Sequence, residues 1–242
     1  IDHANKQQVD LLLIAGDLFD QPPTQQELRE VDYLLSRLNH TRTVLIAGNH
    51  DHLELHDAFS QYKWNSEVYL LDGKQRDHIS FEDLETTIYG FSYWKNQITK
   101  PLYDRMKPDE SESSDFSILL AHGGDESHIP IQREALKWSG FDYIALGHIH
   151  KPMKVGSELY RYCGTPLACS VSEAQQQKGI IMVEMGVKGE IKTTILPLEP
   201  LRQVKVVKGT LEEVLKESCK DYVTVVLTDK ADLDVIDMQE RI

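Results

Sequence analysis

The sequence has few cysteines and no long hydrophobic run. Its 242 residues include only Cys163, Cys169 and Cys219, and no two of them form a Cys-x-x-Cys pair. So sparse a set is untypical of a disulfide scaffold and favours a reducing compartment. No apolar run approaches the ~20 residues that cross a bilayer, and the first residues resemble neither a signal peptide nor a transit peptide. We therefore expect a cytoplasmic protein with no membrane partner.

Positive charge is also scarce. Lys and Arg number 26 against 39 Asp and Glu, which gives a formal net charge of −13. A protein that holds nucleic acid on its bulk surface needs a basic face, so this balance weakly opposes a DNA-binding platform. Carboxylates that bind metal ions, however, count as negative here and are neutralised in the working protein. The charge balance therefore does not exclude DNA.

Strand-like and helix-like segments alternate near the start of the chain. Residues 9–15 and 43–47 are apolar runs that predict fully buried strands, and Thr24 with Glu27 between them has the spacing of a helix capping box. This order is typical of a parallel sheet covered on both faces. Further strands are expected at residues 68–71, 78–84, 86–91, 116–121, 143–146, 159–163, 179–185 and 191–196.

Pro197 and Pro200 mark a boundary in the sequence. Beyond them, residues 203–207, a helix capped by Thr210, and residues 222–227 predict a β-α-β unit, and a last helix is expected from about Asp234. We therefore expect one domain over residues 1–199 and a partial α+β domain over residues 200–242.

Four of the expected strands end beside a glycine in residues that can bind a metal ion. These ends read Gly16-Asp17, Gly48-Asn49-His50-Asp51, His122-Gly123 and Gly147-His148-Ile149-His150. Strand ends of an α/β sheet lie along one edge, where ligand sites form, and glycine lets the backbone turn sharply there. Asp, Asn and His supply the mixed oxygen and nitrogen ligands that Mn, Fe or Zn ions accept. Gly16-Asp17 and His122-Gly123 alone are ordinary in a turn, whereas GNHD and GHIH are stronger signals because a turn needs no histidine there. Together the four strand ends predict a metal site.

The segments GDLFD, GNHD, AHG and GHIH, in this order, resemble the calcineurin-like metallophosphoesterases over residues 9–196. The resemblance implies an α/β fold in which a β-sandwich is flanked by helices in four αββα layers. It also implies a centre of two divalent metal ions, Mn²⁺ above all, with Fe²⁺, Zn²⁺ and Mg²⁺ as alternatives. Such a centre activates a water for phosphoester hydrolysis.

The resemblance also implies a role for each motif residue. Asp17 would bridge the two metal ions, His150 would bind one of them, and the ligands that complete the other site with Asp17 would be Asn49, His122 and His148. The catalytic residues would be His50 and Asp51. His50 would orient the scissile phosphate or protonate the leaving oxygen, and Asp51 would hold the ring of His50 in its orientation.

The family's first motif, Asp-x-His at the end of its first strand, has no match here. The chain begins at Ile1 without an initiator Met, which predicts a piece of a longer protein whose first strand is absent. One metal site then has a complete ligand set, whereas the other has only Asp17 and His150. We expect such a piece to hold one metal ion and to be inactive, and the upstream segment to restore the second ion.

Three features narrow the resemblance to the SbcD-type DNA repair nucleases. Pro22-Pro23 follows GDLFD, the segment YCGTP at residues 162–166 resembles that group's Tyr-x-Gly-Ser-Pro loop, and residues 200–242 look like the start of its DNA-gripping capping domain. Ordinary turns and any small accessory domain explain these features as well. The resemblance implies a manganese-dependent exonuclease and endonuclease acting on DNA, dimeric and partnered with an SbcC-like coiled-coil ATPase.

Two alternatives remain open. A phosphodiesterase or phosphatase acting on small molecules would need the same metal ligands but no grip on DNA. A non-catalytic scaffold would explain the missing Asp-x-His motif, but not the presence of His50. The candidate bases for holding DNA are Lys151 and Lys154, with Lys95 and Lys100, although a solvated surface position explains each of them too.

Overall fold

The computed structural model describes residues 1–64, 67–74, 76–109, 114–187, 189–216 and 219–229. The chain divides into two compact units, one of residues 1–164 with 181–194 and the other of residues 165–180 with 195–242. The helix expected from about Asp234 lies outside the described residues. The assignment of residues 200–242 to a capping domain stays a prediction.

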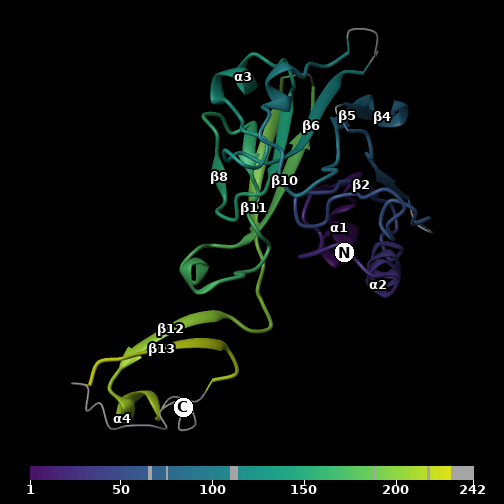
Figure 1. Ribbon diagram of the computed structural model, residues 1–242. Helices are drawn as coiled ribbons and strands as arrows, with labels where there is room; N and C mark the ends of the chain where they lie inside the picture. The colour runs from purple at the N-terminus through teal and green to yellow at the C-terminus, as the bar shows by residue number, and fades with distance from the viewer. Residues whose placement is uncertain (65–66, 75, 110–113, 188, 217–218, 230–242) are drawn as a thin grey trace. The chain divides into compact units, whose positions relative to one another are not determined.

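The first unit carries most of the regular structure (Figure 1). In chain order its elements are α1 (Asp2–Gln7), β1 (Leu11–Ala15), α2 (Gln25–Leu35), β2 (Arg42–Ile46), β3 (Val68–Leu70), β4 (Asp77–Phe81), η1 (Glu82–Leu84), β5 (Thr86–Gly90), η2 (Leu102–Arg105), β6 (Phe116–His122), α3 (Arg133–Lys137), β7 (Tyr143–Gly147), β8 (Met153–Lys154) and β9 (Tyr160–Tyr162). Strands β10 (Gly179–Met185) and β11 (Ile191–Pro197) form a two-stranded sheet, of which the part within residues 181–194 also belongs to this unit.

Strands β1, β2 and β3 form a parallel sheet in that order. The helix α2 begins with the predicted capping box, in which Thr24 accepts a hydrogen bond from the N–H of Glu27 and the Glu27 carboxylate accepts one from the N–H of Thr24. Strand β2 is buried almost throughout, as predicted, because it lies between two neighbours. Strand β1 was expected to be fully buried and is only half-buried along its length, because it is an edge strand of this sheet.

A second sheet has the order β4-β5-β6-β7-β9-β8. Its central strands β5, β6, β7 and β9 run parallel, whereas the edge strands β4 and β8 pair antiparallel to their neighbours. The pairing aligns His122 at the end of β6 with Gly147 at the end of β7. Two of the four strand ends singled out by the sequence therefore lie side by side on this sheet.

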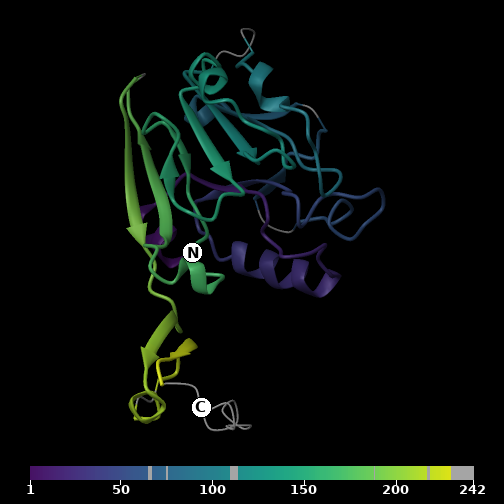
Figure 2. The ribbon, with the colours of Figure 1, turned by 60° about the vertical axis from the view of Figure 1, so that its left-hand side comes forward.

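Three hydrophobic clusters show how the layers of the first unit pack. Between the two sheets, Val44 and Ile46 of β2 pack with Ile118 and Leu120 of β6, and Val183 of β10 joins this cluster. The outer face of the six-stranded sheet packs against η2 and α3, and the outer face of the three-stranded sheet packs against α2 and residues 53–64. Figure 2 shows α2 beside the three-stranded sheet. The mixed α/β class and the layered sandwich are confirmed, with few and short helices.

The second unit contains η3 (Val171–Glu173), β12 (Val204–Gly209), α4 (Leu211–Val214) and β13 (Tyr222–Leu227). Strands β12 and β13 pair parallel and α4 connects them, so the predicted β-α-β unit is present. The buried Lys178 Nζ forms an ion pair of 2.7 Å with the Glu173 carboxylate and donates to the hydroxyl of Thr165 at 2.8 Å, so that it joins the two ends of residues 165–180.

Candidate metal centre

The carboxyl ends of β1, β2, β6 and β7 meet where the two sheets approach one another. The approach is so close that a Cβ atom on Gly147 would overlap the carbonyl oxygen of Ala15. Gly16 has a φ of 80°, and a Cβ atom there would overlap the ring of His122. Glycine is thus required at these two strand ends, because any side chain would hold the sheets apart.

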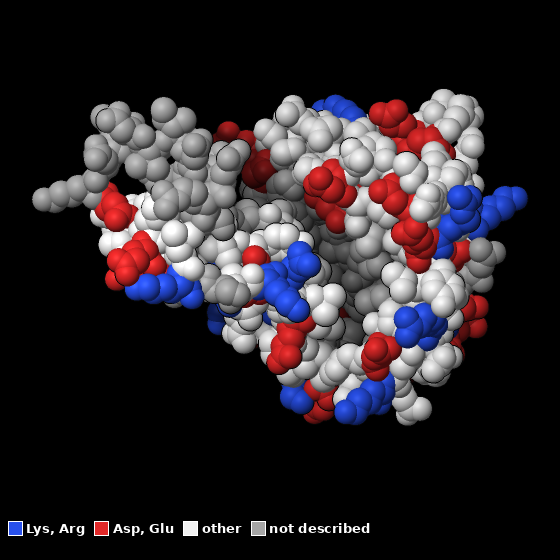
Figure 3. Space-filling view, turned by 90° about the horizontal axis from the view of Figure 1, so that it is seen from below, with Lys and Arg blue, Asp and Glu red and all other residues white. Residues whose placement is uncertain are grey.

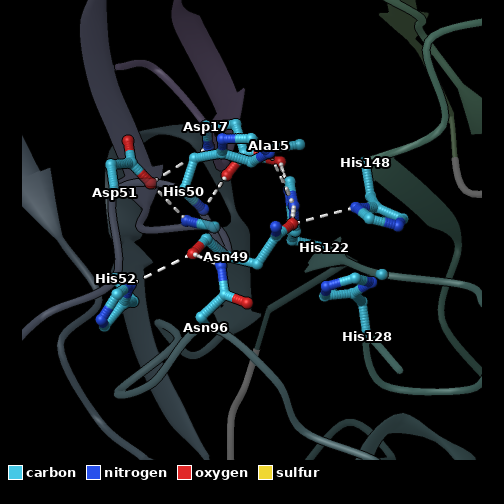
Figure 4. Close-up of polar contacts among 12 residues, drawn as sticks. Ala15, Asp17, Asn49, His50, Asp51, His52, Asn96, His122, His128 and His148 are labelled. Atoms are coloured by element: carbon cyan, nitrogen blue, oxygen red, sulfur yellow. Dashed lines mark hydrogen bonds and ion pairs between the residues drawn. The ribbon is translucent and has the colours of Figure 1, made fainter. Parts of the chain in front are cut away.

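His122 lies at the centre of the cluster and is completely buried. Its Nδ1 is 2.7 Å from the carbonyl oxygen of Ala15. Because a carbonyl oxygen only accepts hydrogen bonds, Nδ1 carries the hydrogen, and in a neutral ring Nε2 carries a lone pair. Figure 4 shows Nε2 facing two oxygens, Oδ1 of Asn49 at 3.0 Å and Oδ2 of Asp17 at 3.2 Å.

Three acceptor atoms therefore converge around one point, and a cation at that point relieves their mutual repulsion. A fourth ligand atom is close, because Nδ1 of His148 lies 3.0 Å from Oδ1 of Asn49. Ligand atoms of Asp17, His122 and His148 all lie within 4.8 Å of one another. A carboxylate, an amide oxygen and two imidazole nitrogens are a donor set suited to Mn²⁺, Fe²⁺ or Zn²⁺. The residues present thus fit a divalent metal ion.

Asp17 is held on both oxygens. Its Oδ1 accepts a hydrogen bond of 2.9 Å from the N–H of His50, while Oδ2 faces His122. The hydrogen bond from the N–H of His50 favours the ionised form of this carboxylate. The backbone φ of Asp17 is 51°, in the left-handed region that a non-glycine residue rarely adopts. The fold thus holds an ionised carboxylate in place.

His148 is also strained, and a carboxylate fixes one of its ring nitrogens. Its φ is 92°, and its Nε2 lies 2.6 Å from Oδ2 of Asp125. Burial lowers the pKa of His148, against the raising effect of Asp125, and favours the neutral ring that a metal ligand requires. Asp125 in turn lies 3.0 Å from Nδ1 of His128, whose ring is next to that of His148 (Figure 4). A positive φ at a residue other than glycine, such as that of His148, is typical of functional sites.

Asp51 does not hold the ring of His50. Its fully buried carboxylate accepts hydrogen bonds from the N–H groups of Gly48, Asp17 and Phe19 at 2.6, 3.2 and 3.2 Å. Burial raises the pKa of Asp51, against the lowering effect of the N–H of Gly48. The carboxylate joins the loop after β1 to the loop after β2, because unpaired N–H groups need an acceptor once they are buried.

The ring of His50 instead contacts Asp20. Its Nδ1 lies 3.0 Å from the carbonyl oxygen of Asp20, and the side chain of His50 is about half exposed, at 48%. The backbone N–H of His50 remains on Asp17. His50 thus lies at the exposed edge of the cluster, one hydrogen bond from the carboxylate at its centre.

Four of the five metal ligands expected from the strand ends lie together. These four are Asp17, Asn49, His122 and His148. His150 is exposed and is not part of this described cluster, so its role as a ligand stays a prediction. Sequence reasoning missed Asp125, which contacts His148, and Asn96, whose Nδ2 donates to the carbonyl oxygen of Asn49. The only signal for Asp125 was its place three residues after His122.

Comparison with known families identifies the protein family that has this arrangement of residues. The model of the calcineurin-like phosphoesterase family matches residues 1–152, which is more than half of the chain. The chain belongs to the calcineurin-like phosphoesterase family. Family membership confirms the resemblance and accounts for a hydrolase site built from ligands of divalent metal ions. In this calcineurin-like phosphoesterase, all four converging residues lie within the matched range.

Two curated relatives are similar over most of the chain. The SbcD component of the nuclease SbcCD from Staphylococcus epidermidis is 26% identical over 249 residues, which cover 90% of this chain and 67% of the relative. The protein of the same name from Staphylococcus saprophyticus is 28% identical over 250 residues, with 90% and 66% covered. The chain thus spans about two thirds of the length of these relatives. None of the helices in the described ranges is both long enough and apolar enough to cross a membrane.

Proposed function

We propose that this phosphoesterase is a metal-dependent DNA nuclease. The observation that carries the proposal is the convergence of Asp17, Asn49, His122 and His148 at the ends of strands from two sheets. Two relatives that align with 90% of this chain, at 26% and 28% identity, are named as a subunit of the nuclease SbcCD. The proposed reaction is hydrolysis of a DNA phosphodiester bond.

Different residues of the chain have different roles in the proposed reaction. Asn49, His122 and His148, with Asp17, would hold the first metal ion, and Asp17 together with His150 would contribute to a second. Divalent ions in such a centre lower the pKa of a water molecule and neutralise phosphoryl oxygens. Buried backbone contacts keep the ligands still, above all the contact of His122 Nδ1 with Ala15.

His50 supplies the proton chemistry. Because its Nδ1 is held by the carbonyl oxygen of Asp20, Nε2 is the atom that exchanges a proton with the leaving oxygen. Its exposed position at the edge of the cluster gives a substrate phosphate access to it. Asp51 supports this arrangement indirectly, because it fixes the two loops that carry Asp17 and His50.

The biological setting is proposed from the resemblance to the SbcD-type nucleases. Mn²⁺ is the expected ion, the partner is an SbcC-like coiled-coil ATPase, and the setting is DNA repair in the cytoplasm by a homodimer. The proposed capping domain of residues 200–242 contributes to the grip on DNA.

The acidic surface restricts where DNA is held. On the described part of the face drawn in Figure 3, basic side chains are interspersed with acidic ones and form no continuous basic patch. Local bases near the site therefore matter more than a general basic field. Lys151 is exposed one residue after His150, whereas Lys154 is ion-paired with Glu158 at 2.8 Å. Lys151→Glu should weaken DNA binding and reduce its salt dependence, and Lys154→Glu should do so less.

Substrate comparison tests the proposal. With Mn²⁺, the full-length protein should cleave DNA ends or nick single strands, and it should also hydrolyse bis-p-nitrophenyl phosphate. His50→Ser should keep its bound metal and lose cleavage, and Lys192→Ser, on an exposed surface of β11, is the matched control. Hydrolysis of the small ester without DNA cleavage would contradict the nuclease proposal and favour a small-molecule phosphodiesterase. Absence of both activities would favour a scaffold.

A further inference from the structure

A second cluster of polar side chains lies behind His148. Asp125 belongs to the loop that follows β6, and its Oδ2 lies 2.6 Å from Nε2 of His148. Its Oδ1 accepts hydrogen bonds from the N–H groups of Ser127 and His128 at 2.8 and 2.9 Å. Nδ1 of His128 lies 3.0 Å from each oxygen of the same carboxylate. Both oxygens of Asp125 are thus held in place by its neighbours.

The contact with Asp125 decides which nitrogen of His148 carries the hydrogen. An ionised carboxylate only accepts hydrogen bonds, so Nε2 of His148 donates to Asp125. A neutral imidazole carries one N–H hydrogen, so Nδ1 presents its lone pair. That lone pair faces Oδ1 of Asn49, on the side of the ring where His122 and Asp17 also converge.

We propose that Asp125 is a positioning residue that fixes His148 in the tautomer and orientation in which Nδ1 binds the metal ion. The inference rests on the proposed role of His148 as a ligand. Metal-binding histidines typically donate their other N–H to a carboxylate, and loss of that carboxylate weakens metal binding about 10–100-fold. The turn over residues 125–128 holds the Asp125 carboxylate in position through backbone N–H groups, and the ring of His128 is a further hydrogen-bond partner.

A separate metal ion held by Asp125, His128 and His148 is the competing explanation, because their ligand atoms also lie within 4.8 Å of one another. The geometry argues against it. An ion there would take Nε2 of His148 as its ligand, and the hydrogen left on Nδ1 would prevent His148 from binding an ion together with Asn49 and His122. In addition, the 2.6 Å separation of Asp125 and His148 is shorter than the roughly 3 Å between neighbouring ligands of an ion bound at about 2.1 Å.

The test is Asp125→Asn in the full chain. The asparagine Oδ1 still accepts from the N–H groups of Ser127 and His128, so the turn is kept. Its NH₂ group, however, now faces Nε2 of His148 and needs an acceptor. The ring should therefore carry its hydrogen on Nδ1, and that nitrogen can no longer bind the metal. Asp142→Asn is the matched control, because Asp142 accepts hydrogen bonds from Ser117 at the opposite end of β6.

Two measurements apply, and neither depends on catalysis. Long-range ¹H–¹⁵N correlation spectra of the metal-free protein should show His148 protonated on Nε2 in the wild type and on Nδ1 in Asp125→Asn. Calorimetric titration with Mn²⁺ should show a dissociation constant about 10–100-fold higher in Asp125→Asn, with the number of sites unchanged. Asp142→Asn should match the wild type in both.

The outcomes separate this inference from the metal centre itself. Asn49→Ala and His148→Ala should each weaken Mn²⁺ binding. If they do and Asp125→Asn does not, the positioning role is wrong. If Asp125→Asn removes one site and leaves the affinity of the rest unchanged, Asp125 is itself a ligand, and the inference is again wrong. If neither Asn49→Ala nor His148→Ala changes Mn²⁺ binding, the proposed centre fails.

Discussion

Nε2 of His122 lies 3.2 Å from Oδ2 of Asp17, although the two residues follow strands of different sheets. A neutral ring whose Nδ1 is committed to Ala15 has only a lone pair to offer the carboxylate. The contact is therefore favourable only with a positive charge between the two atoms. The packing of the two sheets thus brings together ligand atoms that suit a cation.

Asp17→Asn should abolish stabilisation by metal without destabilising the metal-free protein. The asparagine can still accept from the N–H of His50, and its NH₂ group can donate to His122. In the wild type, Mn²⁺ at 100 times its Kd adds about 2.7 kcal/mol to the free energy of unfolding. Thermal unfolding with EDTA and with Mn²⁺ measures both effects. An equal rise in Tm with Mn²⁺ in the variant would contradict the role given to Asp17.

Asp51→Ala should unfold the site rather than only slow the reaction. The change leaves the buried N–H group of Gly48 and the partly buried N–H groups of Asp17 and Phe19 without their acceptor. Each hydrogen bond to a charged group is worth about 1.5–3 kcal/mol, so the loss should exceed about 3 kcal/mol in urea unfolding. Asp51→Asn retains one acceptor oxygen and should lose less. Normal stability with reduced turnover would instead support the sequence-based prediction that Asp51 orients His50.

Tyr162→Phe should make the protein less sensitive to alkali. The hydroxyl of Tyr162 donates to the carbonyl oxygen of Gly123 at 2.8 Å, and burial raises its pKa to about 12. Between the ordinary pKa of about 10 and that value, the folded state retains a proton that the unfolded state loses, so stability falls as pH rises. Urea unfolding at pH 9, 10 and 11 should show a shallower fall in the variant. An unchanged slope would show that this phenol does not contribute.

The three cysteines should react at different rates. Cys169 and Cys219 are exposed, whereas Cys163 is partly covered and burial raises the pKa of its thiol. Thiolate is the reactive form, so Cys163 should react last. A chromogenic disulfide at pH 8 should modify two thiols quickly and the third only slowly or after addition of denaturant. Rapid modification of all three would contradict the packing around Cys163.

Local sequence signals predicted the parts of the fold that depend on local rules. The capping boxes at Thr24 and Thr210 follow from residue spacing, and the buried strands follow from apolar runs bounded by glycine. The half-buried state of β1 could not be predicted, because burial of an edge strand depends on what covers it. The strand predicted over residues 78–84 stops at Phe81, where a short 3₁₀ helix begins.

Only part of the candidate site, likewise, could be predicted from the sequence. Asp17, Asn49, His122 and His148 could be grouped from the sequence because each follows a strand beside a glycine, and they lie together in the structure. Asp125 could not, because its contact with His148 crosses from the loop after β6 to the end of β7. The place of Asp51 was also unpredictable, because its partners are backbone N–H groups that any residue carries.

Anomalous diffraction from crystals grown with Mn²⁺ tests the proposed metal centre most directly. We expect a manganese peak about 2.0–2.3 Å from Oδ2 of Asp17, Oδ1 of Asn49, Nε2 of His122 and Nδ1 of His148, with Nε2 of His148 still on Asp125. A peak coordinated by Asp125 and Nε2 of His148, or no peak among the four strand-end residues at saturating Mn²⁺, would contradict it.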